Sequence, residues 1–498
     1  MKEQTQLREL AGGRLGPLLL KLSWPALVSM TLNALYSVVD RVFIGKGCGT
    51  EAMTALTLAF PVMMIFGAFG VWIGAGHGTV ISIKLGEGDM RSAERTLGQL
   101  VAFKLAVFLT LPVLVWIFLD PILRLSGGGG VTAAPLEGAR TYLKIVLFSH
   151  FFSHLAFGLS AAMRAEGAAR KSMYCMIVGF GTNLVLDPLF IFRSLDFTLF
   201  GLAVHVPFQG LGLGIAGAAW ATDVAMALSC FTALWFYWSG QSAVKLRLSC
   251  IRFSRALVAR AMGVGMAPFL QQLMGAAINF SLAYAFALWA VDKAAADLQI
   301  ASLGVFQSVL IFVIMPVLGA QQGISPILGY NWGARNYERV RSGLVLGFWV
   351  TTVACVAACL VQMVWAEGFA RWFSEDANEA FIRLAAGDLR LSNCMIWTIS
   401  INVVATTYFQ SIGRPKMAIM LSMLRQGLIL LPCIWLLPHF IKDHTFAIWL
   451  ALPVSDVVCQ LATIPPFFSH LRFLRAAAAI RARGPSAALA GSAKEGSK

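Results

Sequence analysis

The sequence predicts an all-α integral membrane protein with twelve transmembrane helices arranged as two six-helix lobes. Three observations predict this class. First, the 498 residues are 58% hydrophobic and 13% charged, whereas soluble domains carry about 25% charged residues. Second, the apolar runs have the length of membrane-spanning helices and lack the alternating pattern of β-barrel strands. Third, similar segments recur in the two halves of the chain.

The apolar runs define the expected spans and their direction. The spans cover roughly residues 17–44, 52–83, 96–119, 141–163, 172–192, 211–238, 257–290, 296–322, 340–365, 380–411, 416–438 and 445–469. The polar start MKEQTQLRELAGGRLGP lacks a cleavable signal pattern, so we expect the first span to direct insertion. Basic residues gather in the loops of one side, which marks that side as cytoplasmic. We therefore expect a multi-pass protein of the inner membrane with both termini in the cytoplasm.

Charge and cysteine usage narrow the function classes. The formal charge of +15 comes mainly from the basic loops, and no soluble basic domain is present to bind nucleic acid. The nine cysteines are scattered, mostly within apolar spans, and no CxxC pair occurs. Buried cysteine is the common case for such positions, so we predict no disulfide framework and no metal site.

Two pairs of segments indicate an internal repeat. The segment LGEGDMRSAER (85–95) after the second span resembles LGYNWGARNYER (328–339) after the eighth. In the same alignment of the two halves, Asp223 of the sixth span corresponds to Asp456 of the twelfth. An even number of spans per half gives a parallel repeat, which is common in transporters. We expect a first lobe at 1–240, a basic cytoplasmic linker at 241–256, a second lobe at 257–470 and a disordered cytoplasmic tail at 471–498.

Acidic residues inside the spans of the first half are the leading functional candidates. Asp187 lies in an apolar run with Asn183 one helical turn before it. At 1.5 Å per residue, Asp40 and Asp187 lie roughly 28 and 24 Å from the cytoplasmic ends of their spans, and Thr222 falls in the same band. Ionisable residues inside membranes are costly and usually functional. The structural alternatives are an Asp40–Arg41 pair, a hydrogen-bonded Asp187 and a packing role for Thr222.

Several segments together resemble one family, the multidrug and toxic compound extrusion (MATE) transporters, in their bacterial DinF-like or MepA-like branch. The resemblance covers about residues 15–470 and rests on LYSVVDRVFIG (35–45), TLAFPV (57–62), LGEGDMRSAER (85–95), TNLVLDPLFIF (182–192), LGLGIAGAAWAT (211–222), QQGISPILGYNWGARNYERV (321–340) and GRPKM (413–417). Any one of these segments is a weak signal, whereas the set is specific.

The resemblance implies two lobes around a central cavity and an exporter that works by alternating access. Such a protein exports amphipathic or cationic compounds in exchange for H⁺ or Na⁺. It needs no cofactor, contacts membrane lipids and is a monomer. The residues that match the family's cation or proton site are Asp40, Asn183, Asp187 and Thr222. Oxygen ligands suit small hard cations, and paired carboxylates can share a proton, which favours H⁺.

Asp223 and the pair Arg425–Asp456 are charged residues of the predicted spans that lie outside that pattern. Asp223 is an extra acid beside Thr222, and because adjacent helical residues point about 100° apart, it is either part of the site or paired elsewhere. In the second half, Arg425 and Asp456 fall at matching depths in the last two spans. We predict that they form a buried ion pair that holds the second lobe together.

Polar side chains in the first and seventh spans are candidates for substrate contact. A polar stripe on one face of the first span consists of Asn33, Tyr36 or Ser37, and Asp40. It indicates either a cavity lining or a hydrogen-bonded seam between helices. Gln271 and Gln272 cannot titrate, so we expect the coupling ion to bind in the first lobe. We expect these two amides to contact substrate instead.

Two histidines, His150 and His154, have the i, i+4 spacing of metal ligands. No HExxH motif and no third ligand accompany them, so a satisfied buried pair is the favoured interpretation. Their role and that of Asp223 stay open at this point.

Two other function classes were weighed. A flippase for a lipid-linked oligosaccharide shares the fold superfamily, but its anionic substrate calls for cavity-facing Arg or Lys. The first and seventh predicted spans contain none from 22 to 39 or from 261 to 291, although Lys104, Lys144 and Arg425 lie elsewhere. No nucleophile–base motif, phosphate loop or metal motif is present, so the chain is not expected to be an enzyme.

Overall fold

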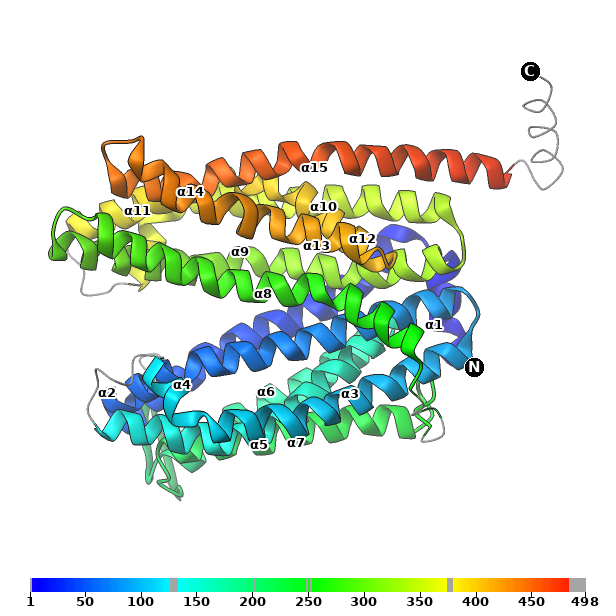
Figure 1. Cartoon of the computed structure of the whole chain (residues 1–498). Helices are drawn as coiled ribbons and strands as arrows, with labels where there is room; N and C mark the ends of the chain where they lie inside the picture. Colours follow the sequence, from blue (N-terminus) through cyan, green and yellow to red (C-terminus); the bar gives the residue numbers. More distant parts are fainter. Residues whose placement is uncertain are drawn as a thin grey trace. The chain divides into compact units, whose positions relative to one another are not determined.

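The computed structural model describes residues 2–125, 133–199, 202–247, 250, 253–373 and 379–482. These residues are almost entirely helical (Figure 1). The α-helices are α1 (Lys2–Gly12), α2 (Leu15–Gly86), α3 (Met90–Ile117), α4 (Leu119–Leu125), α5 (Ala133–Ala165), α6 (Ala169–Ile191), α7 (Ile215–Trp238), α8 (Arg255–Trp289), α9 (Lys293–Gly333), α10 (Tyr337–Phe373), α11 (Glu379–Asn393), α12 (Ile399–Ser411), α13 (Pro415–Met423), α14 (Leu431–Leu436) and α15 (His444–Ala482).

Most of the predicted spans are present as long apolar helices. In the part of the chain that the structure describes, ten helices can cross a membrane by length and composition, and α5 adds an eleventh if its two segments, bent by 49°, count as one span. The helix α2 contains two spans, Leu15–Gly49 and Glu51–Gly86. It breaks at Gly49, whose φ of +77° suits glycine. The prediction of a twelve-span, all-α membrane fold is confirmed in its main features.

The predicted span 380–411 is the exception, because it forms two pieces. The helix α11 ends at Asn393, a 3-10 turn covers Ile396–Thr398, and α12 follows. Arg383, Asp388 and Arg390 make α11 amphipathic instead of uniformly apolar. Charged residues and a break within one span explain why neither piece alone is long and apolar enough to cross a membrane.

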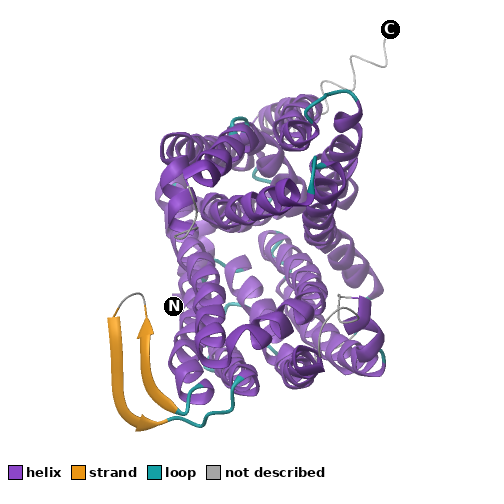
Figure 2. Cartoon of the chain, turned by 90° about the vertical axis from the view of Figure 1, so that its left-hand side faces the viewer, coloured by secondary structure: helices purple, strands orange, loops and turns teal. Residues whose placement is uncertain are grey.

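The connection between α6 and α7, for which the sequence suggested no regular structure, contains strands. It contains a two-stranded antiparallel sheet of β1 (Ser194–Leu199) and β2 (Leu202–Gln209), in which Leu199 pairs with Leu202. Figure 2 shows this hairpin standing clear of the helices. The helix α7 begins at 215 and not at the predicted 211, because Gly212 and Gly214 have positive φ angles and interrupt the helix.

The predicted tail is more ordered than expected, and the predicted linker is anchored at its start. The helix α15 continues to Ala482, since the alanine-rich run after Leu474 favours helix. The predicted tail is therefore helical over 471–482, and 483–498 lies outside the described residues. At the start of the predicted linker 241–256, the buried Glu166 carboxylate accepts hydrogen bonds from Ser242 Oγ at 2.8 Å and from Ala243 N at 2.9 Å.

The chain divides into two compact units. The first contains Pro25–Ile81 and Arg91–Gly265, and the second contains Leu7–Trp24, Ser82–Met90 and the residues from Met266 onward. The helix α2 thus contributes to both units. Its segment Pro25–Ile81 belongs to the first unit together with α3, α5, α6 and α7.

Within the first unit, α7 packs against both α5 and α6, as Figure 1 also shows. Small residues allow the close approach. A Cβ added at Gly217 of α7 would lie 2.4 Å from the Phe190 carbonyl oxygen, and one added at Gly179 of α6 would lie 3.0 Å from Ser229 Cβ. This packing sets which faces of α6 and α7 meet, and so determines the position of their polar side chains.

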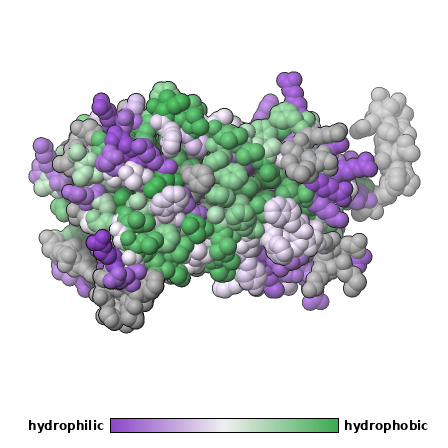
Figure 3. Space-filling model, turned by 90° about the horizontal axis from the view of Figure 1, so that it is seen from below, coloured by the Kyte–Doolittle hydropathy of each residue, from purple (hydrophilic) through white to green (hydrophobic). Residues whose placement is uncertain are grey.

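The surface has the pattern of a membrane protein. On the face seen in Figure 3, hydrophobic residues form a band across the middle and hydrophilic residues gather at its ends. Large apolar side chains such as Leu109, Trp116 and Phe231 are more than half exposed. A water-soluble protein rarely exposes apolar area on this scale. The chain is a multi-pass membrane protein.

Candidate cation and proton site in the first unit

Three helices of the first unit bring the predicted polar residues together. Asp40 comes from the outer part of α2, Asn183 and Asp187 come from α6, and Thr222 comes from α7. All four side chains are buried, with exposed fractions of 7% for Asp40 and 1% for Asp187. The sequence placed these residues at similar depths, and the structure shows that their side chains also converge.

Asn183 connects the cluster through its amide. Its Nδ2 donates to Asp187 Oδ1 at 3.0 Å, one turn along α6, and to Thr222 Oγ1 at 3.4 Å. The hydroxyl groups of Tyr36 and Thr222 are 3.2 Å apart and share a hydrogen bond. The network is made of neutral donors, so it orients the Asp187 carboxyl without supplying a positive charge.

The carboxyl groups of Asp40 and Asp187 lie within hydrogen-bonding reach of each other. Two carboxylates cannot share a hydrogen bond unless one of them carries a proton. Among the described residues, Asp40 Oδ1, Asp187 Oδ2 and Asn183 Oδ1 are buried without a hydrogen-bond partner. Buried oxygens in this state need a proton, a water molecule or a small cation to offset the cost of desolvation.

The alternative pairing of Asp40 with its neighbour receives little support. The Arg41 guanidinium carbon lies 5.5 Å from the centre of the Phe60 ring, in a cation–π arrangement. Arg41 does act on Asp40 electrostatically. The side chain nevertheless stacks on an aromatic ring, which leaves the Asp40 carboxyl directed at Asp187.

Asp223 and Tyr142 belong to the surroundings of the cluster. Asp223 is 5% exposed and, like Asp40 and Asp187, interacts electrostatically with Tyr142 of α5. Tyr142 itself is 3% exposed. The sequence analysis missed Tyr142, because a single tyrosine in an apolar span is usually a core residue. The only sequence feature that points to Tyr142 is its depth in the predicted span, which is similar to that of the acids, and this feature is weak.

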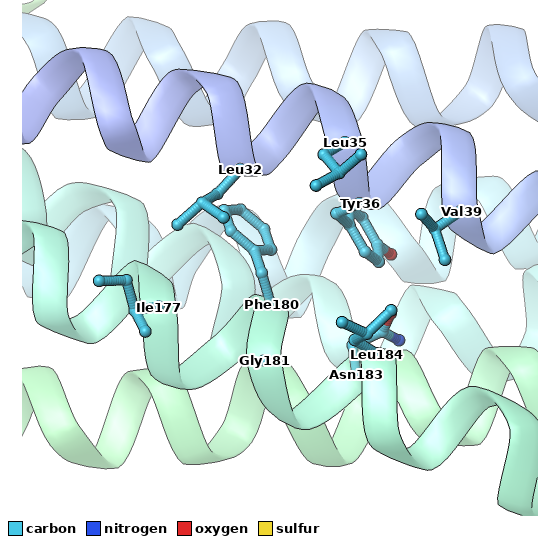
Figure 4. Close-up of a pocket in the computed structure, with 9 residues that line it drawn as sticks. All are labelled: Leu32, Leu35, Tyr36, Val39, Ile177, Phe180, Gly181, Asn183 and Leu184. Atoms are coloured by element: carbon cyan, nitrogen blue, oxygen red, sulfur yellow. The ribbon is translucent and has the colours of Figure 1, made fainter. Parts of the chain in front are cut away.

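A pocket of about 130 Å³ adjoins the cluster. Its lining residues come from α2 and α6 and are Leu32, Leu35, Tyr36, Val39, Ile177, Phe180, Gly181, Asn183 and Leu184. Figure 4 shows the polar ends of Tyr36 and Asn183 at the same end of an otherwise apolar pocket. The pocket therefore offers an apolar wall with polar groups at one end, next to the two acids. Tyr36 also stacks on Phe180, with ring centres 5.3 Å apart.

The other predicted substrate-contacting residues do not line this pocket. Asn33 lies on the same part of α2, with a half-buried side chain. Gln271 and Gln272 lie in α8 within the second unit, where Gln271 is exposed and Gln272 is half-buried. The structure brings Tyr36 to the acid cluster and leaves Asn33, Gln271 and Gln272 outside it.

The second unit contains the predicted pair of opposite charges. Arg425 Nε donates to Asp456 Oδ1 at 2.6 Å, and Asp456 is 2% exposed. Arg425 lies in a π-helical turn, Leu424–Leu430, between α13 and α14. Such a turn inserts one residue into a helix and redirects the side chains near it.

Together, the repeated helical halves and the buried acids are features of a membrane transporter fold. The MatE family model matches residues 25–189 and residues 273–436, which together make up more than half of the chain. The chain belongs to the MatE family, and the resemblance found in its sequence is confirmed. The same model matches twice, once in each half, which supports the repeat.

Named relatives and solved structures agree with this assignment. The chain is 24% identical to the multidrug export protein MepA of Staphylococcus aureus over 453 residues, covering 89% of this chain and 91% of the relative. It resembles an outward-facing multidrug resistance MATE family transporter with a TM-score of 0.83, 21% identity and coverage of 94% and 98%. A MOP superfamily transporter from Pyrococcus furiosus gives a TM-score of 0.83, 22% identity and the same coverage.

Proposed function

We propose that this protein is a secondary active exporter of amphipathic, cationic compounds, which it moves by alternating access in exchange for H⁺ or Na⁺. The observation that carries the proposal is the Asp40–Asp187 pair, buried beside an apolar pocket in a MatE family chain. The relative named as a multidrug export protein adds support for this substrate class. An apolar pocket with nearby acids suits a hydrophobic cation.

Of the two coupling ions, we propose H⁺. Two carboxyls within hydrogen-bonding reach of each other form a natural holder for a single proton. A sodium site would use the same unpartnered oxygens of Asp40, Asp187 and Asn183, and direct measurement separates the two ions. We further propose that the protein works in the inner membrane as a monomer, with both termini in the cytoplasm, no cofactor and no enzymatic activity.

The lipid flippase is the weaker alternative. It needs cationic side chains facing the cavity, and two of the three candidate cations are engaged elsewhere. Lys104 donates to the Gly70 carbonyl oxygen at 2.7 Å, and Arg425 pairs with Asp456. Lys144 alone is exposed, and one lysine is a poor match for a pyrophosphate.

The test is transport in proteoliposomes with ethidium as the probe, imposing a pH gradient and a Na⁺ gradient in separate experiments. We expect the pH gradient to drive dye movement in the wild type and not in the Asp40→Asn or Asp187→Asn variants. Asp297→Asn, which changes an exposed acid on α9, is the matched control and is expected to transport normally. If neither gradient moves dye with folded protein, the proposal is contradicted.

A further inference from the structure

A second cluster of titratable side chains lies in the first unit and has no part in the acid site. His77 of α2, Lys104 of α3, and His150 and His154 of α5 are all basic. His77 and Lys104 are 0% and 1% exposed, and His154 is 8% exposed. Basic groups within a membrane span are rare and usually functional, so this cluster requires an explanation of its own.

Lys104 is held in an unusual way for a buried lysine. Its Nζ donates to the Gly70 carbonyl oxygen at 2.7 Å. Among the described residues, no carboxylate forms a salt bridge with it, and an ammonium group has three hydrogens to place. A permanently charged ammonium with a single carbonyl partner is costly inside a membrane.

Two glycines make the space that this cluster occupies. A Cβ added at Gly70 would lie 3.1 Å from His154 Nδ1, and one added at Gly158 would lie 3.0 Å from Lys104 Cε. Glycine inside a helix costs about 1 kcal/mol relative to alanine. Gly70 and Gly158 therefore lower the stability of their own helices, but they allow α2, α3 and α5 to approach closely around Lys104 and His154.

His77 has a buried ring nitrogen that is able to accept a proton. Its Nδ1 lies 2.8 Å from the Ile73 carbonyl oxygen, and since a carbonyl only accepts, Nδ1 carries the hydrogen. Its Nε2 is buried and has no hydrogen-bond partner among the described residues. Lys104 interacts electrostatically with both His77 and His154.

The cluster extends along α5 toward the acid site. Tyr142 lies in the first segment of α5, whereas His150 and His154 lie in the second segment, beyond the bend of 49°. The two histidines are four residues apart and share a helix face. The rings of His150 and His154 are 5.5 Å apart at their centres. Tyr142 interacts electrostatically with Asp40 and Asp187, and both histidines follow it along α5 in the direction of Ala165. His77 is about 14 Å from Gly86, where α2 ends on the side that we expect to be cytoplasmic.

We propose that His150, His154, Lys104 and His77 form a proton relay between the Asp40–Asp187 site and the cytoplasmic side. This inference rests on the proposed exchange for H⁺. A proton leaves the carboxyl pair, crosses the gap from Tyr142 to His150 on water, and passes through His154 to the Lys104 amine and then to His77 Nε2. Each group accepts one proton and releases one, so nothing else is consumed. Gly70 holds Lys104 in place through its carbonyl oxygen.

A metal site is the competing explanation for the histidine pair, and the structure disfavours it. Among the described residues, no group of three histidine, cysteine or acidic side chains could hold a metal ion. Lys104 would also repel a cation bound at His154. A purely structural role remains the alternative that an experiment must separate from the relay.

The test compares two modes of transport by the reconstituted full-length protein. One is ethidium movement driven by a pH gradient, and the other is exchange of ethidium across the membrane at equal pH, which needs no net proton transfer. We expect Lys104→Met, His154→Gln and His77→Gln to lower gradient-driven transport by at least about tenfold while exchange stays within about twofold. Lys144→Met and His439→Gln, which change exposed residues, are the matched controls.

Each other outcome overturns the relay. Equal losses in both modes would assign the cluster a structural role, and gradient-driven transport at the wild-type rate would show that protons take another route. Transport driven only by Na⁺ would also contradict the relay while leaving the exporter intact. If the wild type moves no dye in either mode, the proposed function itself fails, which the relay variants do not decide.

Discussion

The two units bury acids equally well but give them different partners. Asp187 in the first unit is 1% exposed, and Asp456 in the second is 2% exposed. Asp187 accepts from the neutral amide of Asn183 at 3.0 Å, whereas Asp456 accepts from the Arg425 guanidinium at 2.6 Å. Burial therefore does not distinguish the two sites, and the charge of the partner does.

This difference separates a carboxylate that can bind and release a proton or cation from one whose charge is balanced permanently. A carboxylate paired with arginine has its charge balanced permanently, because arginine does not lose its proton in proteins. A carboxyl that contacts a neutral amide and a second carboxyl has its charge balanced only when a proton or cation arrives. The comparison predicts that transport depends on the first-unit acids and that stability depends on the second-unit pair.

The largest expected effect on stability comes from breaking the second-unit pair. In Arg425→Met, the Asp456 carboxylate stays buried without a cation, which typically costs about 3–5 kcal/mol. We expect a clear drop in the thermal unfolding temperature of the detergent-purified protein and lower expression. The double variant Arg425→Met/Asp456→Leu is the control and should recover most of the loss. Unfolding of the single variant at the wild-type temperature would contradict the account.

The first-unit acids should behave in the opposite way. In Asp187→Asn, the amide cannot exchange a proton, so we expect gradient-driven ethidium transport to fall about tenfold or more, equivalent to at least about 1.4 kcal/mol. Stability should stay the same or rise, because a poorly partnered carboxylate is removed. Transport assays and thermal unfolding on one preparation check both signs. A large loss of stability would place Asp187 with the structural acids.

A smaller effect is expected at Thr222. In Thr222→Val, the hydroxyl that bonds Tyr36 and accepts from Asn183 is lost, at about 1 kcal/mol per hydrogen bond. We expect transport to fall severalfold with little change in unfolding temperature. Thr232→Val on the same helix is the matched control, because its hydroxyl bonds only the Leu228 carbonyl of its own helix. Equal effects of both variants would argue against a site role for Thr222.

The spans were predictable because the bilayer imposes a fixed length of apolar helix. Features that depend on tertiary contacts were not. The hairpin Ser194–Gln209 is an apolar segment too short for a span, and no turn pattern was recognised in it. The break at Asn393 follows from charges in α11 whose packing the sequence does not reveal. The link from Glu166 to Ser242 joins residues far apart in the chain.

The site was predictable in its members and depth but not in its geometry. Helical rise places Asp40, Asp187 and Thr222 in one layer, yet their convergence depends on how α6 and α7 pack through glycines such as Gly217. Tyr142 was missed because it enters from α5, where nothing in the local pattern distinguishes it from a core residue. His150, His154 and Lys104 were noted in the sequence, but their grouping was not predictable, since the members of the cluster are on three helices.

Proton release on substrate binding tests the central claim most directly. Ethidium is added to the detergent-purified protein in weak buffer containing a pH indicator. The account predicts proton release by the wild type and by Arg425→Met/Asp456→Leu, and none by Asp40→Asn or Asp187→Asn, with dye binding confirmed in each sample. Undiminished release by both acid variants, or its loss only in the second-unit variant, would contradict the assignment of coupling to the first unit.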